Sequence, residues 1–331
     1  MRLINPLPAL AMVIVVILSS HIAFASNIVW SDEFNQPNGS SPDPTKWSFE
    51  IGNGSGGWGN SELEYYTSSL QNAYVSNGVL NIVAYTNSIA GFSFTSARMK
   101  SQYLYYTPVY GTLEWRAKLP SGTGMWPALW LLGSNYPTAG WPNCGEIDVV
   151  ENNGATPTWV QGTLHWSGGS IGGQKYNFPS GDSVTNWHVY DLSWAPGVMK
   201  FYVDGNLWET DSGLSAPFNQ PFFFIMNLAV GGNYVGNPSV AAIKAGTAFP
   251  QAMQVDYVRV YEPTLPLAIA VTPQSDGSMM LSWPTNIVCH LQVQTNSLVG
   301  GNWSDLPGTT SPYVVMPDPS QGAVFYRLES P

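Results

Sequence analysis

Charged residues are scarce in this sequence, and basic residues most of all. Only 10% of its 331 residues are charged, well below the roughly 25% usual in globular proteins. The 11 lysines and arginines stand against 21 acidic residues, so the net charge is −10. Nucleic acids, anionic lipids and sulfated polymers need a clustered basic surface, so the composition argues against all three. We expect a monomer with a neutral partner, and no nucleic acid or membrane as partner.

Cysteine is almost absent. The chain has 2 cysteines, Cys144 and Cys289, and no Cys/His cluster with the spacing of a zinc site. We expect the two to be separate thiols, because they fall in different predicted domains.

Apolar runs long enough to span a bilayer are missing too. The run from Leu10 to Leu18 follows a lone Arg2 and is shorter than the ~20 residues of a spanning helix. Ala23-Phe24-Ala25 then supplies the small-x-small pattern of a signal-peptide cleavage site. We therefore predict a signal peptide over residues 1–25 and a secreted mature protein that begins near Ser26. An uncleaved anchor is the alternative.

Aromatic residues and turn formers, in contrast, are abundant. The chain has 14 Trp, 17 Tyr and 13 Phe beside 33 Gly and 26 Pro, which favours strands joined by turns over helices. We predict an all-β fold of two sheets packed face to face. The clearest strand patterns are Gly78–Tyr85, the hairpin of Met199–Val203 and Asn206–Trp208 around Asp204-Gly205, the apolar run Phe222–Val230, and Val255–Tyr261.

The texture of the sequence changes near residue 262. Pro263 and Pro266 flank a short break, after which the strand patterns become shorter. We predict a main domain over residues 26–262, a linker over 263–266 and a small C-terminal β-sandwich module over 267–331. The aromatic residues of this module suit a carbohydrate-binding surface or a small core, and a spacer role is equally compatible.

The most informative segment is Gly145–Glu151, which reads Gly-Glu-Ile-Asp-Val-Val-Glu. Side chains alternate along a strand, so Glu146 and Asp148 share one face while Glu151 has the wrong parity. A β-bulge across Val149-Val150 would add one residue and return Glu151 to that face. Three carboxylates would then line one face of an otherwise apolar strand.

Crowding like charges in this way raises at least one pKa and is costly without a function. Glycoside hydrolysis needs such a group, because one ionised carboxylate acts as the nucleophile and one protonated carboxyl acts as the acid. An exposed acidic edge strand and a calcium site are the alternatives. The interleaved Ile and Val argue against the first, and calcium prefers a loop that supplies backbone carbonyls.

The acidic segment resembles the signature of glycoside hydrolase family 16 in its bulged E-I-D-x-x-E form. The resemblance covers residues 27–262, in the motif order of bacterial laminarinases. Its further motifs are Trp58–Thr67, Thr95–Arg98, Gly122–Trp130, Gly140–Pro142, Gln220–Gly232, Phe249–Gln251 and Val255–Tyr261.

The resemblance implies a β-jelly-roll sandwich with a concave cleft, and a retaining endo-glycosidase that cuts β-1,3-glucan. It implies Glu146 as the nucleophile, Glu151 as the acid/base, and Asp148 as the residue that tunes the protons between them. No cofactor is required for this chemistry.

The family also often holds a structural calcium on the convex side of the sandwich. Here that implies a site made by Asp256 with backbone carbonyls near Glu33 and Gly78. A buried Asp256 that caps a turn is the alternative.

Aromatic residues near the acidic segment are candidates for sugar binding. Indole faces stack on the C–H faces of sugar rings, which suits Trp126, Trp130 and Trp141. For Trp130, core packing is equally compatible.

Four polar residues are further candidates for the cleft. Asn60, Glu64 and Arg98 could bind hydroxyl groups, and the resemblance implies that Asn60 and Arg98 lie in the cleft. It also implies that His165 lies near the carboxylates, where it could hydrogen-bond Asp148. A structural histidine is the alternative.

Two other functions stay open. An enzyme of the same family could act on mixed-linkage β-1,3-1,4-glucan or agarose, because cleft loops decide the substrate. A non-catalytic glucan-binding protein is the second, although the presence of both Glu146 and Glu151 argues against it.

Overall fold

The structure is a computed structural model that describes Met12–Val13 and residues 27–262, 269–283, 289–295, 303–318, 320–321 and 323–329. The chain divides into two compact units, Ser26–Pro263 and a second unit that contains Thr264–Pro331. Most of the predicted signal peptide and all of the predicted linker lie outside the described residues.

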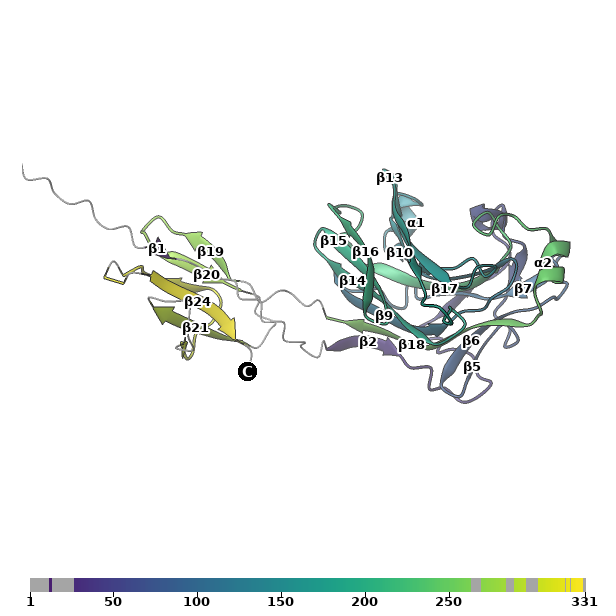
Figure 1. The fold of residues 1–331 in the computed structure, drawn as a ribbon, viewed down its shortest axis with the longest axis horizontal. Coiled ribbons are helices and arrows are strands. Elements are labelled where there is room, and N and C mark those ends of the chain that lie inside the picture. The colour runs from purple at the N-terminus through teal and green to yellow at the C-terminus, as the bar shows by residue number, and fades with distance from the viewer. Residues whose placement is uncertain are drawn as a thin grey trace, which may run out of the picture. The chain divides into compact units, whose positions relative to one another are not determined.

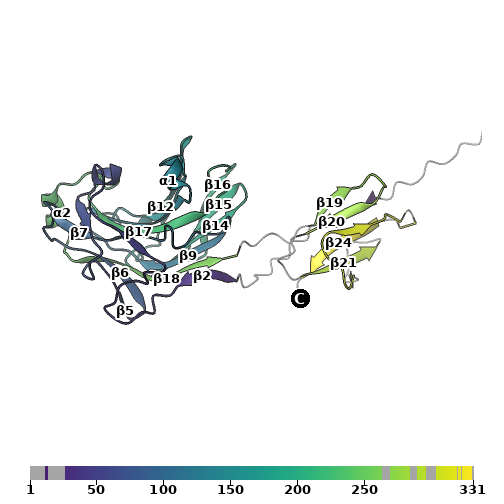
Figure 2. The ribbon, with the colours of Figure 1, turned by 180° about the vertical axis from the view of Figure 1, so that it is seen from behind.

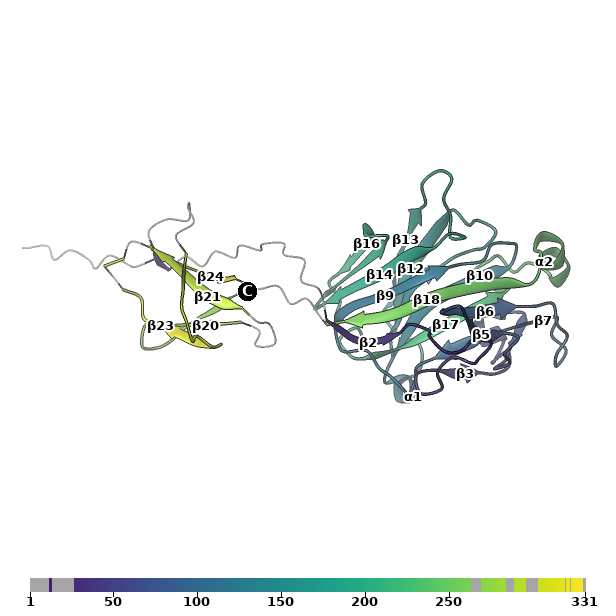
Figure 3. The ribbon, with the colours of Figure 1, turned by 90° about the horizontal axis from the view of Figure 1, so that it is seen from below.

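One sheet of the Ser26–Pro263 unit has eight antiparallel strands. Their order is β16-β15-β14-β9-β18-β6-β5, and β2 also pairs with β18. The last strand of the unit, β18 (Gln251–Tyr261), lies in the middle of this sheet between β9 (Gly111–Lys118) and β6, as Figure 3 shows. The other strands are β2 (Ile28–Asp32), β5 (Ala73–Ser76), β6 (Val79–Ala84), β14 (His188–Ala195), β15 (Val198–Val203) and β16 (Asn206–Ser212).

The second sheet has seven antiparallel strands in the order β13-β12-β11-β10-β17-β8-β3. The two sheets form stacked, curved layers, with the seven-stranded sheet on the concave side (Figures 1 and 2). The strands are β3 (Ser48–Glu50), β8 (Arg98–Lys100), β10 (Met125–Gly133), β11 (Glu146–Glu151), β12 (Trp159–Trp166), β13 (Gly169–Asn177) and β17 (Phe222–Val230).

Alternation along the strands separates the core from the concave face. On β10, Met125, Leu129 and Leu131 join the core between the sheets, while Trp126 and Trp130 point to the other side of the sheet. Large side chains that are completely buried fill the core, each contributing roughly 1.5–3 kcal/mol through its burial. They include Trp115, Tyr190, Phe201, Phe222 and Phe224.

The remaining elements of this unit are short. A parallel pair is formed by β4 (Glu64–Tyr66) and β7 (Phe94–Ser96). An irregular turn, η1 (Gly57–Ser61), and two short helices, α1 (Tyr136–Ala139) and α2 (Val240–Gly246), complete it. No helix in the described ranges is long and apolar enough to cross a bilayer.

The second unit consists of two small sheets. Strands β19 (Ala270–Pro273), β20 (Met279–Ser282) and β23 (Tyr313–Val315) form one. The other contains β1 (Met12–Val13), β24 (Ala323–Glu329), β21 (His290–Thr295) and β22 (Ser304–Asp305). Tyr326 belongs to its core, and Trp283 and Tyr313 pack against that core.

The all-β prediction is confirmed. The apolar run Phe222–Val230 coincides with β17. Asp204 and Gly205 join β15 to β16 with φ of 50° and 76°, as a two-residue hairpin turn requires. Cys144 and Cys289 are free thiols, as expected.

Candidate active site

The acidic strand β11 contains the predicted bulge. Asp148 pairs with Trp130 and Val150 pairs with Leu129, so Val149 has no partner on β10. Both Val149 and Val150 consequently turn into the main core. Glu151 returns to the concave face, where it lies with Glu146 and Asp148.

The three carboxylates line a cavity of about 740 Å³ on the concave face. Nine of the ten residues predicted for catalysis or sugar binding line it. They are Asn60, Arg98, Trp126, Trp130, Trp141, Glu146, Asp148, Glu151 and His165.

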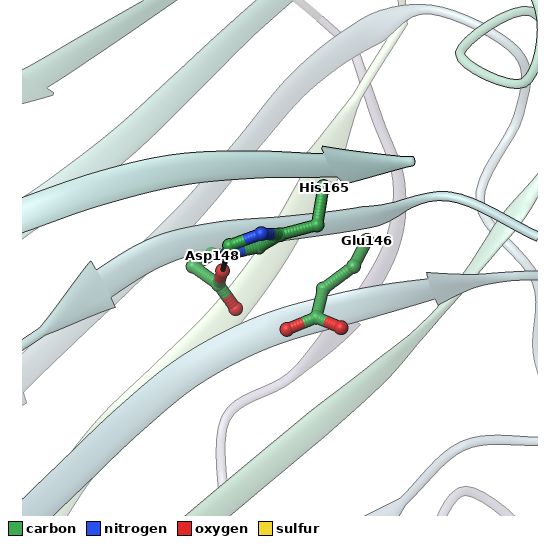
Figure 4. A group of neighbouring side chains, drawn as sticks. All are labelled: Glu146, Asp148 and His165. Atoms are coloured by element: carbon green, nitrogen blue, oxygen red, sulfur yellow. Dashed lines mark ion pairs between the residues drawn. The ribbon is translucent and has the colours of Figure 1, made fainter. Parts of the chain in front are cut away.

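Glu146 is the carboxylate with most partners. Burial raises its pKa, while His165 and hydrogen bonds with Asp148 and Trp141 oppose the rise. The Trp141 indole Nε1 donates to Glu146 Oε2 from a side chain that is 58% exposed. The nearby His165 Nε2 lies 3.2 Å from Asp148 Oδ2 (Figure 4). These contacts favour an ionised Glu146 over its two neighbours.

Asp148 and Glu151 are poised to hold protons. Burial, followed by the charges of Glu146 and Glu151, raises the pKa of Asp148 well above its ordinary value. Burial also raises the pKa of Glu151 to about 7, with a further rise from Glu146. Trp126 Nε1 donates to Glu151 Oε1 at 2.9 Å and opposes this rise. The three carboxyl groups of the strand therefore lie in environments that favour ionisation to different extents, and Glu146 has the most groups that oppose the effect of burial.

A wall of stacked groups forms another part of the cavity. The Arg98 guanidinium lies 4.5 Å from the Trp58 ring centre and 4.7 Å from that of Trp130. Its charge is paired with Glu50, so the wall presents little net charge. Trp130 Nε1 donates to Asn227 Oδ1 at 2.7 Å, which fixes the indole plane. Flat aromatic faces with few free charges suit neutral sugar rings.

Comparison with known proteins identifies the family. Residues 60–259, more than half of the chain, match the family described as "Glycosyl hydrolases family 16". The chain belongs to this family. It is therefore a glycoside hydrolase by family, and its sandwich is the expected β-jelly roll. The unit Ser26–Pro263 contains the match and is the family 16 domain of this chain.

Individual relatives support the membership. The chain is 39% identical over 267 residues to glucan endo-1,3-beta-glucosidase A1 of Niallia circulans (71% of this chain, 38% of that protein). It is 40% identical over 252 residues to the beta-glucanase of Rhodothermus marinus (71% of this chain, 84% of that protein). The laminarinase catalytic domain from Thermotoga maritima has 41% identity and a TM-score of 0.65, over 72% of this chain and 99% of that domain. The chain thus spans only 38% of the first relative's length.

Glu64 is the predicted site residue that does not reach the cavity of the family 16 domain. It is completely buried behind the cavity, where its Oε2 accepts from the Val230 backbone N–H at 2.6 Å. Burial and the neighbouring Glu62 raise its pKa well above its ordinary value. Glu62 lines the cavity instead, 3.5 Å from Asn60 Nδ2. The sequence prediction for Glu64 was wrong because β4 begins at Glu64 and turns that side chain inward.

Sequence reasoning missed several residues that line the cavity of the family 16 domain. Trp58 and Glu62 fall in the motif Trp58–Thr67, so this motif already carried their signal. Glu50, Gln161, Asn227 and Tyr234 also line the cavity. Asn227 falls in the motif Gln220–Gly232, and its pairing with Ala128 on β10 places it beside the acidic strand's neighbour.

The residues predicted to bind calcium lie on or beside strands of the eight-stranded sheet of the family 16 domain. Asp256 lies where β18 changes partners, because Val255 pairs with Leu80 on β6 and Val258 pairs with Asp32 on β2. The Glu33 carboxylate is ion-paired with Arg259 at 2.8 Å, so the calcium site stays a prediction. Asp256 Oδ2 also accepts from Arg116 at 2.6 Å, a cation that competes with a metal.

A second group with metal-ligand character lies in the cavity itself. Ligand atoms of Glu146, Asp148 and His165 all lie within 4.8 Å of one another. Their hydrogen bonds to one another and to Trp141 account for this closeness.

Proposed function

We propose that the family 16 domain is a retaining endo-β-1,3-glucanase, with Glu146 as the nucleophile and Glu151 as the acid/base. The observation that carries the proposal is the bulged strand β11, which presents three carboxylates in different protonation environments to one cavity. Retaining glycosidases need this combination of an ionised and a protonated group.

Two steps complete the reaction. The Glu146 carboxylate attacks the anomeric carbon while Glu151 transfers its proton to the glycosidic oxygen, whose bond to that carbon breaks. Glu151 then takes a proton from a water molecule that attacks the same carbon and releases Glu146. The raised pKa of Glu151, about 7, suits both the donating and the accepting step.

Asp148 and His165 act behind the nucleophile in this proposal. A protonated Asp148 donates a hydrogen bond to Glu146 and keeps its charge localised. The His165 ring, 3.2 Å from Asp148, holds that carboxyl in place. Asp148 can therefore stabilise Glu146 without taking part in bond exchange.

The substrate proposal rests on the cavity and on the relatives. Trp58, Trp130 and the paired Arg98 offer flat, nearly neutral surfaces that suit uncharged sugars. The named relatives are β-glucanases, and the Thermotoga maritima neighbour is called a laminarinase. β-1,3-Glucan is the substrate that agrees with both lines of support.

The deciding experiment measures product release by purified residues 26–331 on laminarin, mixed-linkage glucan, xyloglucan and agarose. The control is Glu146→Gln, which keeps the shape of the cavity and removes the nucleophile. We expect laminarin to yield short β-1,3 oligomers, with a loss of at least about 10³-fold in the control. Cleavage of another polymer alone would overturn the substrate and keep the mechanism. Glucan binding without turnover by the wild type would indicate a binding protein.

We also infer export, a monomeric state and a structural calcium. Arg2, the run Leu10–Leu18 and the Ala23-Phe24-Ala25 site support removal of residues 1–25, which N-terminal sequencing of the exported protein tests. Size-exclusion chromatography with light scattering tests the monomer. If Asp256 holds calcium, chelation lowers the Tm of the wild type and leaves Asp256→Asn unchanged.

A further inference from the structure

Tyr234 lies on the cavity wall next to the acid/base, in the segment that follows β17. Its ring stacks on Trp126, with ring centres 5.0 Å apart and planes inclined by 18°. Gly232 permits this approach, because a Cβ there would lie 3.0 Å from both the Asn60 carbonyl and the Trp126 ring. The backbone of Gly232 also has a φ of +97°. Position 232 therefore favours glycine for two reasons, the close approach of Trp126 and the positive φ.

The hydroxyl of Tyr234 is buried and has no hydrogen-bond partner among the described residues. A buried hydroxyl without a partner costs roughly 1–3 kcal/mol, so its retention needs a reason. The charges it feels come from Glu151 and Asp148, which together with burial raise its pKa far above the ordinary value. The phenol thus stays a proton donor throughout the working pH range.

The Glu151 carboxylate also lacks a hydrogen bond. Its Oε1 accepts from Trp126 Nε1 at 2.9 Å, and no described donor serves its second oxygen. Glu146 and Asp148 on the same strand face Glu151, and the charge of Glu146 disfavours its ionised form. Yet Glu151 must become an anion each time it gives its proton to a leaving group.

We propose that Tyr234 is a positioning residue whose hydroxyl donates a hydrogen bond to the Glu151 carboxylate whenever that group is ionised. In the present structure both side chains contact Trp126, Tyr234 by ring stacking and Glu151 by a hydrogen bond from the indole. The proposal rests on the proposed role of Glu151, and it adds a reason for the orphaned hydroxyl.

The test compares Tyr234→Phe with the wild type. This variant keeps the ring and removes the hydroxyl. Losing a donor to the charged form raises the pKa of Glu151, so the alkaline limb of the kcat profile moves upward by roughly half a pH unit or more. We also expect kcat to fall about tenfold with little change in KM, because the hydrogen bond forms only as charge develops.

Titration of Glu151 by carbon-13 NMR gives a readout that needs no substrate. Glu151→Gln assigns the signal, and Tyr234→Phe should titrate at higher pH than the wild type. If the wild type cleaves no glycan, the proposed function fails while this titration still decides the role of Tyr234. A 3-fluorotyrosine at position 234 is a stronger donor and should lower the pH at which Glu151 titrates. This substitution tests the proposal even if Tyr234→Phe folds poorly.

Tyr190→Phe is the matched control, because Tyr190 also has a buried hydroxyl without a partner but lies in the core between the sheets. It should leave both the kcat limb and the Glu151 titration unchanged. If Tyr234→Phe matches the wild type in both, and only Tyr234→Leu impairs the enzyme, Tyr234 acts through ring packing and the proposal is overturned.

Discussion

Glu146 and Glu151 lie on one strand but differ in how readily they ionise, because their neighbours differ. Glu146 is held by Trp141 and by the Asp148–His165 pair, which favours its charge. Glu151 accepts a hydrogen bond from Trp126, and burial raises its pKa to about 7. The same residue type can thus serve as nucleophile and as acid, because hydrogen-bond donors lower a carboxyl pKa and desolvation raises it.

Removing the Trp126 donor tests this account. In Trp126→Phe the pKa of Glu151 rises, because the lost hydrogen bond had favoured the carboxylate. A general acid works while protonated, so the wild-type kcat/KM should fall as the pH rises through about 7. In the variant this fall should occur at higher pH, with a lower maximum. The measurement is the pH profile of kcat/KM on laminarin.

Trp130→Phe is the control for that profile. Its indole donates its N–H to Asn227 and not to Glu151. The rate can fall in this variant, but the position of the alkaline limb should not move. A limb that moves equally in both variants would contradict a direct effect of Trp126.

At the scale of elements, the bulge in β11 decides which side chains face the cavity. It sends Val149 and Val150 together into the core and Glu151 out of it. Strand alternation then gives the concave sheet one apolar face and one functional face.

Changing the length of β11 checks the parity argument. Deleting Val149 leaves Glu146, Asp148 and the shifted Glu151 at regular spacings of two, so all three stay on the concave face. We expect laminarin cleavage to persist at a reduced rate, with a stability loss of roughly 1–3 kcal/mol for the missing core side chain. Inserting Ala before Glu151 either turns that carboxylate inward, if the bulge stays, or moves it one residue further along the strand, if the bulge is lost, and both should abolish turnover. Folding of both variants is checked by thermal melts; equal loss of activity in two folded variants would disprove the argument.

Parity also explains what the sequence could predict. A continuous apolar run predicted β17, turn chemistry predicted the Asp204-Gly205 hairpin, and parity predicted the bulge. Glu64 was chosen only as a polar residue of its motif, and no periodic pattern across the irregular turn η1 indicated that its side chain is buried. Tyr234 was invisible for a related reason: its position depends on a loop that contacts Trp126 far away in the sequence.

For the whole molecule, buried carboxyl groups make the stability of the fold depend on pH. Burial raises the pKa of Glu209 to about 7, and the neighbouring Asp211 raises it further. Burial and Glu114 raise the pKa of Asp191 to about 7. Glu209 is only 2% exposed and faces the interior of the sandwich beside Asp211. Ionising such groups in the folded state is unfavourable relative to the unfolded chain.

The sign of the resulting pH dependence is definite. A carboxyl whose pKa is raised by folding contributes stability that is complete below its unfolded pKa and is lost as the pH rises through about 7. We expect the Tm to fall between pH 5 and pH 8. Glu209→Gln should gain roughly 1–3 kcal/mol relative to the wild type at pH 8, and no such gain at pH 5. Differential scanning calorimetry at the two pH values measures it.

Asp43→Asn provides a control of opposite sign. Hydrogen bonds from Thr45 lower the pKa of Asp43, so this variant should lose stability at neutral pH and approach the wild type in acid. A Glu209→Gln gain that is independent of pH would point to relief of packing strain instead of charge burial.

The central position of β18 has a consequence for the order in which this protein can fold. The strand is the last of its unit in the chain, yet β9 and β6 meet only through it. During synthesis, neither neighbour can complete its pairing until Tyr261 has emerged, and the acidic strand lacks a finished layer to pack on. Until then, much of the apolar surface of the nascent chain is exposed to solvent. This favours slow, cooperative folding and binding of the nascent chain by chaperones.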